Sequence, residues 1–222
     1  MRSRTGISSL VILFLAIAPL AASASVVARL SLDQMVAMAS NILVGRVVSQ
    51  ESYWEGGIIA TYVELEVSET YKGSFVEGQH VTIYQHGGAV GDLTMIVPGE
   101  PTFRTGEDVL LFLEDRGTDS QPLVLGMSQG KFEVTVDPGT GLRMVGRNLE
   151  GLELLEIDVE AMELLVPSAC RSVPVDPESS PETSERRRRE CGEDLLTHQT
   201  QRIPLDLMEA EIERLLQLQE VQ

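Results

Sequence analysis

The sequence predicts a mainly β fold: a small antiparallel β-barrel, preceded by a short helix and followed by an amphipathic helix. The strongest signal is residues 41–73, where two long strands are joined by a turn at residues 55–57. In the second strand Val63, Leu65 and Val67 alternate with polar residues, so one face is buried and the other contacts water. Further apolar segments at regular spacing bring the total to about seven strands, as in small sandwiches and barrels.

The remaining strands are predicted from short apolar runs between turn residues. Residues 109–113 are apolar throughout and have turn residues on both sides, which favours a strand buried on both faces over a helix. Residues 131–136 and 142–145 are joined by Asp137-Pro138-Gly139-Thr140-Gly141, a sequence typical of a hairpin turn. A domain of this kind buries enough apolar surface to fold without extra crosslinks.

Helices are predicted at the two ends of the mature chain. Ser31 followed three residues later by Gln34 is a capping box, which begins a short helix. Near the C-terminus, Pro204 suits the first turn of a helix. The apolar residues that follow recur at helical spacing and predict one buried face: Leu205, Met208, Ile212, Leu215 and Leu216.

Residues 1–24 have the three regions of a secretory signal peptide. Two arginines precede an apolar stretch at residues 10–20, and Ala22-Ser23-Ala24 is a small-residue cleavage site. A membrane anchor is the competing interpretation, but Pro19 interrupts the stretch, which is shorter than the roughly 20 residues that span a bilayer. We expect a mature chain that begins at Ser25, is secreted or periplasmic, and has no stable membrane anchor. The residue directly after the cleavage site is Ser25 and not a cysteine, so lipid anchoring is not expected.

The mature chain divides into three parts by composition. Residues 25–166 form the predicted barrel domain. Residues 167–202 are rich in proline, glutamate and arginine and have few large apolar residues, which indicates a loop or linker. Residues 203–222 contain the C-terminal helix.

The linker segment contains the two cysteines of the chain, Cys170 and Cys191. In an oxidising compartment we expect these two residues to form a disulfide, whereas a metal site would need more thiols or nearby histidines. The same segment contains four consecutive arginines, residues 186–189. They are either a basic recognition patch or, because glutamates surround them, a locally neutralised run in contact with water.

The protein is strongly acidic, with 34 acidic and 17 basic residues and a net charge of −17. A surface of this charge repels phosphates, so nucleic-acid binding is excluded. Negative charge also keeps an exported protein soluble, and it attracts basic partners or cations.

The sequence contains no motif for catalysis. There is no G-x-S-x-G, H-E-x-x-H, C-x-x-C, phosphate-binding glycine loop or EF-hand spacing. His80 and His86 flank one predicted strand, but in an extended strand they would lie about 20 Å apart, too far to share a metal. We therefore name no catalytic residue, metal site or cofactor, and expect a protein that is not an enzyme.

Aromatic residues cluster at the first hairpin. Tyr53, Trp54 and Tyr62 are close in the sequence, and Trp54 is the only tryptophan of the chain. Such side chains can form a contact patch for a protein or a sugar, because they combine a large contact area with a polar group. Alternatively, they seal one end of the barrel.

Several strand motifs together resemble the tissue inhibitor of metalloproteinases and netrin-like module, which also occurs in exported bacterial proteins. The likeness is carried by residues 41–49, by residues 62–67 with Tyr71-Lys72-Gly73, and by Phe103 with residues 106–113 and 129–132. It covers residues 30–145. The resemblance implies an OB-like barrel of five strands with helices packed against it, and a protein partner, namely a secreted metalloprotease.

The chain departs from that family at the residue that inhibits the protease. In the animal inhibitors an N-terminal cysteine chelates the protease zinc, whereas cleavage here exposes Ser25. Cys170 and Cys191 both lie outside the matched region, so the inhibitory mechanism is not carried over. The alternative is an envelope or matrix protein that binds polysaccharide through the barrel face, as OB folds can.

Overall fold

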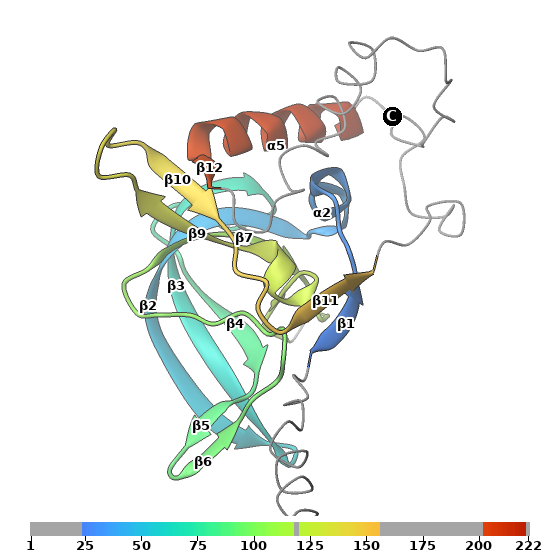
Figure 1. The fold of residues 1–222 in the computed structure, drawn as a ribbon, viewed down its shortest axis with the longest axis vertical. Helices are drawn as coiled ribbons and strands as arrows, with labels where there is room; N and C mark the ends of the chain where they lie inside the picture. Colours follow the sequence, from blue (N-terminus) through green and yellow to red (C-terminus); the bar gives the residue numbers. More distant parts are fainter. Residues whose placement is uncertain (1–23, 118–119, 156–201, 221–222) are drawn as a thin grey trace, which may run out of the picture.

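The computed structural model describes residues 24–117, 120–155 and 202–220, and it is mainly β (Figure 1). This confirms the predicted class. The main sheet is antiparallel throughout and has eight strands. In pairing order these are β12 (Ile203–Pro204), β10 (Arg143–Gly146), β9 (Lys131–Val136), β7 (Asp108–Glu114), β2 (Asn41–Glu55), β3 (Ile58–Lys72) and β4 (His80–His86), with β8 (Leu123–Val124) beside β7.

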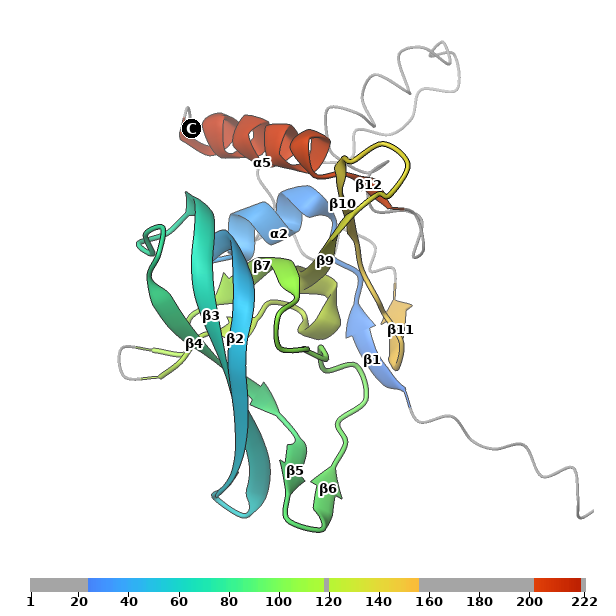
Figure 2. The same ribbon diagram turned by 90° about the vertical axis from the view of Figure 1, so that its left-hand side faces the viewer.

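Two smaller strand pairs lie outside the main sheet. The strand β1 (Ser25–Ala28) runs parallel to β11 (Leu152–Leu155). The strand β5 (Gly88–Val90) runs antiparallel to β6 (Leu93–Met95) and forms a short hairpin. In Figure 2 this hairpin lies beside the far end of the β2–β3 hairpin, away from the helices.

The β2–β3 hairpin is the longest pairing in the sheet. Glu55 pairs with Ile58, so the turn consists of Gly56 and Gly57, whose φ angles are +59° and +90°. Glycine adopts positive φ at little cost, which is why the turn is visible in the sequence. The register shifts at three places between Ile42 and Ser49. Irregularities of this kind bend and twist a strand pair, so the sheet curls.

The central strand β7 is buried on both faces, as its sequence predicts. It pairs with β2 on one side and with β9 on the other. Leu110 and Phe112 pack into one apolar core, together with residues of the two helices. The other three apolar residues of β7 pack into a second core, enclosed by the curled part of the sheet: Val109, Leu111 and Leu113.

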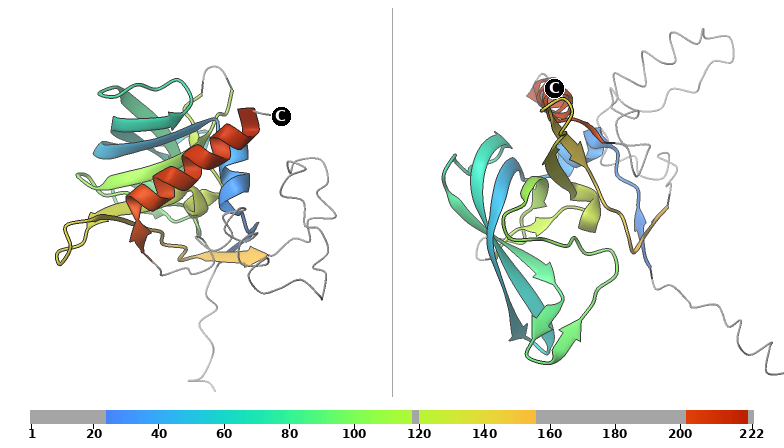
Figure 3. Two further views of the ribbon diagram at one scale, coloured as in Figure 1. Left: turned by 90° about the horizontal axis from the view of Figure 1, so that it is seen from above. Right: turned by 60° about the vertical axis from the view of Figure 1, so that its left-hand side comes forward.

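Two helices cover the first of these cores. The helix α2 (Leu32–Met38) begins at Ser31 with the predicted capping box. The helix α5 (Leu205–Glu220) lies across α2 and the sheet (Figure 3), and its buried residues are Leu205, Met208, Ile212 and Leu215. Leu216 is partly buried against the same core. The predicted apolar face of the C-terminal helix is therefore confirmed.

The curled sheet does not form a regular closed barrel within the described part of the chain. The amide of Tyr84 in β4 donates a hydrogen bond to the carbonyl of Pro122, 2.9 Å away, just before β8. No further pairing joins β4 to β8 in these ranges. The described residues also contain twelve strands rather than about seven, because β1, β5, β11 and β12 are two to four residues long. Strands this short show no alternation in the sequence.

Several predictions concern residues outside the described ranges. The proposed signal peptide lies almost wholly within residues 1–23, and Cys170, Cys191 and the arginine run lie within residues 156–201. These predictions remain predictions. Neither of the two described helices is long and apolar enough to cross a membrane.

Replacing Gly45 with alanine should destabilise the fold. A Cβ atom at Gly45 would lie 2.8 Å from the carbonyl oxygen of Glu66, an approach that backbone atoms must move to relieve. We expect a loss of about 1–3 kcal/mol, the usual cost of overpacking. The matched control is Gly139→Ala, because a Cβ atom there has only an ordinary contact, 3.4 Å from Asp137 Oδ1. Urea unfolding checks both variants. Equal unfolding midpoints for the two would contradict the predicted clash at Gly45.

Candidate functional site

The structure separates the three aromatic residues that the sequence grouped. Tyr53 and Trp54 are neighbours in β2, so their side chains point to opposite faces of the hairpin. Tyr62 lies on the face of Tyr53, and the two ring centroids are 6.0 Å apart with the rings edge to face. Trp54 pairs with Ile59 in β3. The structure therefore places Tyr53 and Tyr62 on one face and Trp54 on the other, and binding by these residues stays a prediction.

An aromatic row (Tyr53, Tyr62, Tyr84 and His86) crosses three strands. The ring centroids of Tyr62 and Tyr84 are 5.6 Å apart, and those of Tyr84 and His86 are 5.2 Å apart. The guanidinium of Arg116 lies 4.3 Å from the Tyr84 ring centroid, within range of a cation–π interaction. Tyr84 is only 6% exposed, so the middle of the row is buried, while Tyr53 at one end is 49% exposed.

The far ends of two hairpins carry exposed apolar side chains. We call this region the hairpin tip, which has exposed side chains on both faces of the β2–β3 hairpin: Tyr53, Trp54 and Ile58 from β2–β3, and Leu93 and Ile96 from β5–β6 and the residues after it. The two hairpins lie side by side in all views (Figures 1 and 2), and the amide of Ile59 donates to Met95 Sδ at 3.4 Å. Trp54 is 53% exposed and Ile96 is 82% exposed. The tip is therefore open to solvent.

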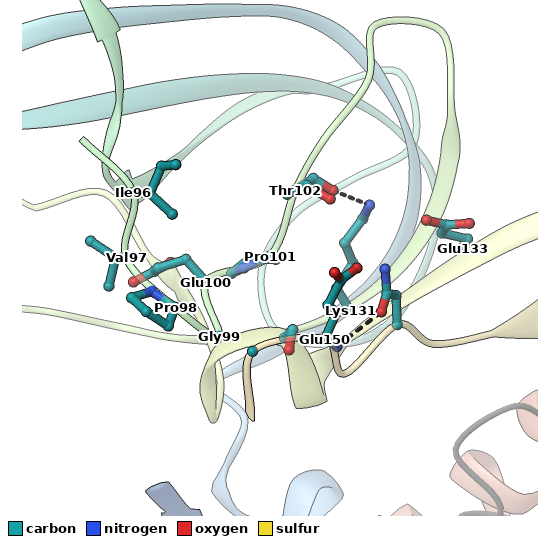
Figure 4. A pocket seen from close by; sticks show the side chains of 13 residues that line it. Ile96, Val97, Pro98, Gly99, Glu100, Pro101, Thr102, Lys131, Glu133 and Glu150 are labelled. Carbon is teal, nitrogen blue, oxygen red and sulfur yellow. Dashed lines mark hydrogen bonds between the residues drawn. The ribbon is translucent and has the colours of Figure 1, made fainter. Parts of the chain in front are cut away.

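A cavity of about 390 Å³ lies next to this tip. Four segments line it: the loop 96–102 that follows β6, Ser128 of the 3-10 helix η1 (Met127–Gly130), the start of β9, and residues 148–151. Figure 4 shows Ile96 and Val97 on one side of the cavity and Glu133 on the other. The lining combines aliphatic side chains with several charged ones.

Ser25 joins two walls of the cavity. Its hydroxyl donates to the carbonyl of Pro98 at 2.6 Å, and its backbone amide donates to the carbonyl of Gly151 at 2.9 Å. The predicted first residue of the mature chain thus lies at the cavity rim, as the first residue of β1.

Lys131 is the one basic residue that lines the cavity, and its charge is already paired. Its side chain is 6% exposed, and Nζ donates to Glu107 Oε1 at 2.7 Å. It also donates to the carbonyl of Thr102 and lies 4.7 Å from the ring centroid of Phe103. A buried ammonium requires such partners, so Lys131 holds the loop 96–102 against β9.

Glu100 is a largely buried carboxyl group on the opposite wall. Its side chain is 13% exposed, and Oε1 lies 2.7 Å from His86 Nδ1. Burial raises the pKa of Glu100, because it disfavours the charged form, while the contact with His86 acts in the opposite direction. The cavity is thereby linked through His86 to the end of the aromatic row.

The floor of the cavity has an unusual backbone. Met127 adopts a φ of +61°, which costs energy for a residue other than glycine, and follows Gly126 at +63°. This conformation begins η1 and places the amide of Ser128 3.0 Å from the carbonyl of Gly99. Ser128 is only 4% exposed, and its Oγ has no hydrogen-bond partner within the described part of the chain. A buried hydroxyl normally has one, so Ser128 is an exception that needs an explanation.

The histidines and acidic groups do not form a metal centre. His80 Nδ1 lies 2.8 Å from Glu64 Oε1, and His86 contacts Glu100 instead. Within residues 24–117, 120–155 and 202–220, no three His, Cys, Asp or Glu side chains come together as metal ligands. The expected absence of metal and cofactor stays an expectation, because the linker with both cysteines lies outside these ranges.

Comparison with known proteins gives no relative on which to base an assignment: no protein-family model matches the chain, and no curated protein matches it. The geometry of the hairpin tip and of the cavity therefore carries the functional argument.

Replacing Glu100 with glutamine should change how stability depends on pH. A carboxyl whose pKa is raised in the fold stabilises below its ordinary value of 4.5, and this stabilisation is lost as the pH rises through the folded pKa. Relative to Glu100→Gln, the unmodified protein should therefore lose free energy of unfolding as the pH rises above 4.5. Urea titrations at several pH values check this. The control is Glu77→Gln, because Glu77 is exposed. The prediction would be refuted if Glu100→Gln and the unmodified protein differed in stability by the same amount at every pH.

Proposed function

We propose that this chain is an exported, non-enzymatic protein-binding module with an OB-like barrel, and that its partner is a secreted metalloprotease that it inhibits or regulates. The observation that carries the binding proposal is the hairpin tip, with five exposed apolar or aromatic side chains on two adjoining hairpins. Exposed apolar groups at one end of an otherwise acidic, soluble protein favour an interaction site over a purely structural role.

Support for the OB-like arrangement comes from the curl of the sheet. The strands β7, β2, β3 and β4 are neighbours in that order around one apolar core. The segment before β8 accepts one backbone hydrogen bond from β4. The helices pack outside this core, as the resemblance to the netrin-like module implies.

A protein partner has more support than a polysaccharide. Sugars stack on the exposed faces of aromatic rings, but the rings of the aromatic row face one another edge-on and Tyr84 is buried. The Tyr62 hydroxyl already donates a hydrogen bond to Glu55 Oε2, 2.7 Å away. Half-exposed Trp54 is the kind of aromatic anchor that is enriched at protein interfaces.

The proposed inhibition does not use chelation of zinc by the N-terminus. The backbone amide of Ser25 donates a hydrogen bond to the carbonyl of Gly151, and its hydroxyl donates one to the carbonyl of Pro98. A group that holds two loops together is not free to approach a metal in another protein. Contact through the hairpin tip is therefore the mode that we propose.

Removing the tip side chains should abolish partner binding without unfolding the protein. We expect Trp54→Ala with Ile58→Ala to lower affinity at least about tenfold, because central aromatic anchors contribute 2 kcal/mol or more at interfaces. The immobilised chain is incubated with secreted proteins of its source, and retained metalloprotease is quantified and tested for inhibition.

The control replaces exposed apolar residues on the β9–β10 hairpin, Val136→Ala with Leu142→Ala, which lies away from the tip (Figure 1). Thermal unfolding should be unchanged in both double variants. Equal retention by the tip and control variants would exclude the tip as the binding surface. Retention of the chain on insoluble glycan, lost in the tip variant, would favour polysaccharide instead.

A further inference from the structure

The cavity beside the hairpin tip has features of a binding site that the tip does not use. Its volume of about 390 Å³ falls within the size range of small-ligand pockets. Ser128 is one of its lining residues, and the strained Met127 lies directly before it; the buried Oγ of Ser128 has no hydrogen-bond partner among the described residues. Strained backbone and an unpaired buried polar group at one place are typical of ligand sites.

Charge determines which ligands the cavity admits. Three carboxyl groups line it, those of Glu100, Glu133 and Glu150, whereas its one lysine is neutralised by Glu107. Neither Glu133 nor Glu150 has a side-chain hydrogen bond or salt bridge within the described residues. An anion would meet net negative charge here, whereas a cation would gain two unpaired carboxylates.

Positive charges lie in a second groove that adjoins the cavity. Arg104, Arg147 and Arg202 line it, together with Glu133 and Glu150. Arg202 donates to Thr135 Oγ1 at 3.2 Å, and the Arg147 guanidinium lies 5.7 Å from the Phe132 ring centroid. These arginines reduce the negative potential at the two glutamates from one side, so the favourable place for a cation is within the cavity, between the glutamates and the loop 96–102.

The aliphatic lining indicates what kind of cation fits. The side chains of Ile96, Val97, Pro98 and Pro101 form one wall, which can pack against methylene groups (Figure 4). Lysine and arginine carry such an aliphatic stem with a charged end. Their charged ends would be paired by the carboxylates of Glu133 and Glu150.

We propose that this cavity binds a lysine or arginine side chain of the protein partner. This deepens the proposed function and rests on it. Ile96 connects the two places, since it belongs to the hairpin tip and also lines the cavity. A partner that docks on the tip therefore lies within reach of the cavity, and its basic side chain supplies the charge that the acidic protein attracts.

Binding can be tested without the partner. The full chain, labelled with ¹⁵N, is titrated with Nα-acetyl-lysine N-methylamide and with the norleucine analogue, which has the same stem but no charge. We expect saturable shifts of the amide signals of Gly99, Ser128 and Gly151 with the lysine compound only. Added salt should weaken the binding, because dissolved ions screen the attraction between the charges.

Substitutions locate the interaction. Glu133→Gln with Glu150→Gln should lower the affinity about tenfold through lost charge. Ser128→Ala leaves both carboxylates in place and should keep the affinity, while the melting temperature stays the same or rises, since the variant removes an unsatisfied buried hydroxyl. Glu77→Gln is the control and should leave affinity unchanged. Equal shifts with the norleucine analogue, or undiminished affinity in the double glutamine variant, would overturn the proposal.

The tip variant Trp54→Ala with Ile58→Ala separates this inference from the proposed function. It should lose the partner but retain the lysine compound, and the glutamine variants should weaken both. If no partner is retained by any form of the chain while the lysine compound still binds the cavity, the proposed function fails and the cationic site stands. If the partner binds equally well to the glutamine variants, the cavity is not where its basic side chain sits.

Discussion

The architecture rests on the burial of β7 on both faces. Five consecutive residues, Val109 to Leu113, are inaccessible to solvent, which is possible only when apolar layers cover the sheet above and below. Burying each large aliphatic or aromatic side chain contributes about 1.5–3 kcal/mol, so these layers supply much of the driving force for folding. The helices α2 and α5 form one layer, and the curl of β2, β3 and β4 forms the other.

This arrangement leaves the outer end of the β2–β3 hairpin beyond both cores. The helices do not reach it, and the β5–β6 hairpin lies against one side only (Figure 2). Apolar side chains there remain exposed, which does not stabilise the isolated protein. A partner that covers them would recover that burial, which gives the hairpin tip its proposed role.

The cavity arises where the chain returns from this tip to β7. The loop 96–102 leaves β6 and is held in place near its end, where Glu100 contacts His86 and the carbonyl of Thr102 accepts a hydrogen bond from Lys131. Because Ser25 also contacts this loop, four distant parts of the sequence meet around one space. The geometry is thus fixed by long-range contacts, while the chemistry comes from a few polar side chains within it.

Local patterns were sufficient to predict the mainly β class, the β2–β3 turn, the double burial of β7 and the two helices. Each of these follows from residue spacing along a single segment, and hydrophobic alternation or a capping box needs no knowledge of the rest of the chain. Tyr53, Trp54 and Tyr62 were found as neighbours in the sequence. The opposite faces of Tyr53 and Trp54 follow from their adjacency in one strand, whereas the placement of Tyr62 beside Tyr53 depends on the register of β2 against β3.

Tertiary structure alone established the cavity, the aromatic row and the unpaired hydroxyl of Ser128. The cavity residues lie in segments separated by tens of positions, and none carries a recognisable motif. Whether a hydroxyl finds a partner, or a carboxyl is shielded from water, depends on which distant segments pack around it. Alternation along a strand predicts only which face of the strand a side chain is on. The contacts between distant segments determine which residues pack against that face.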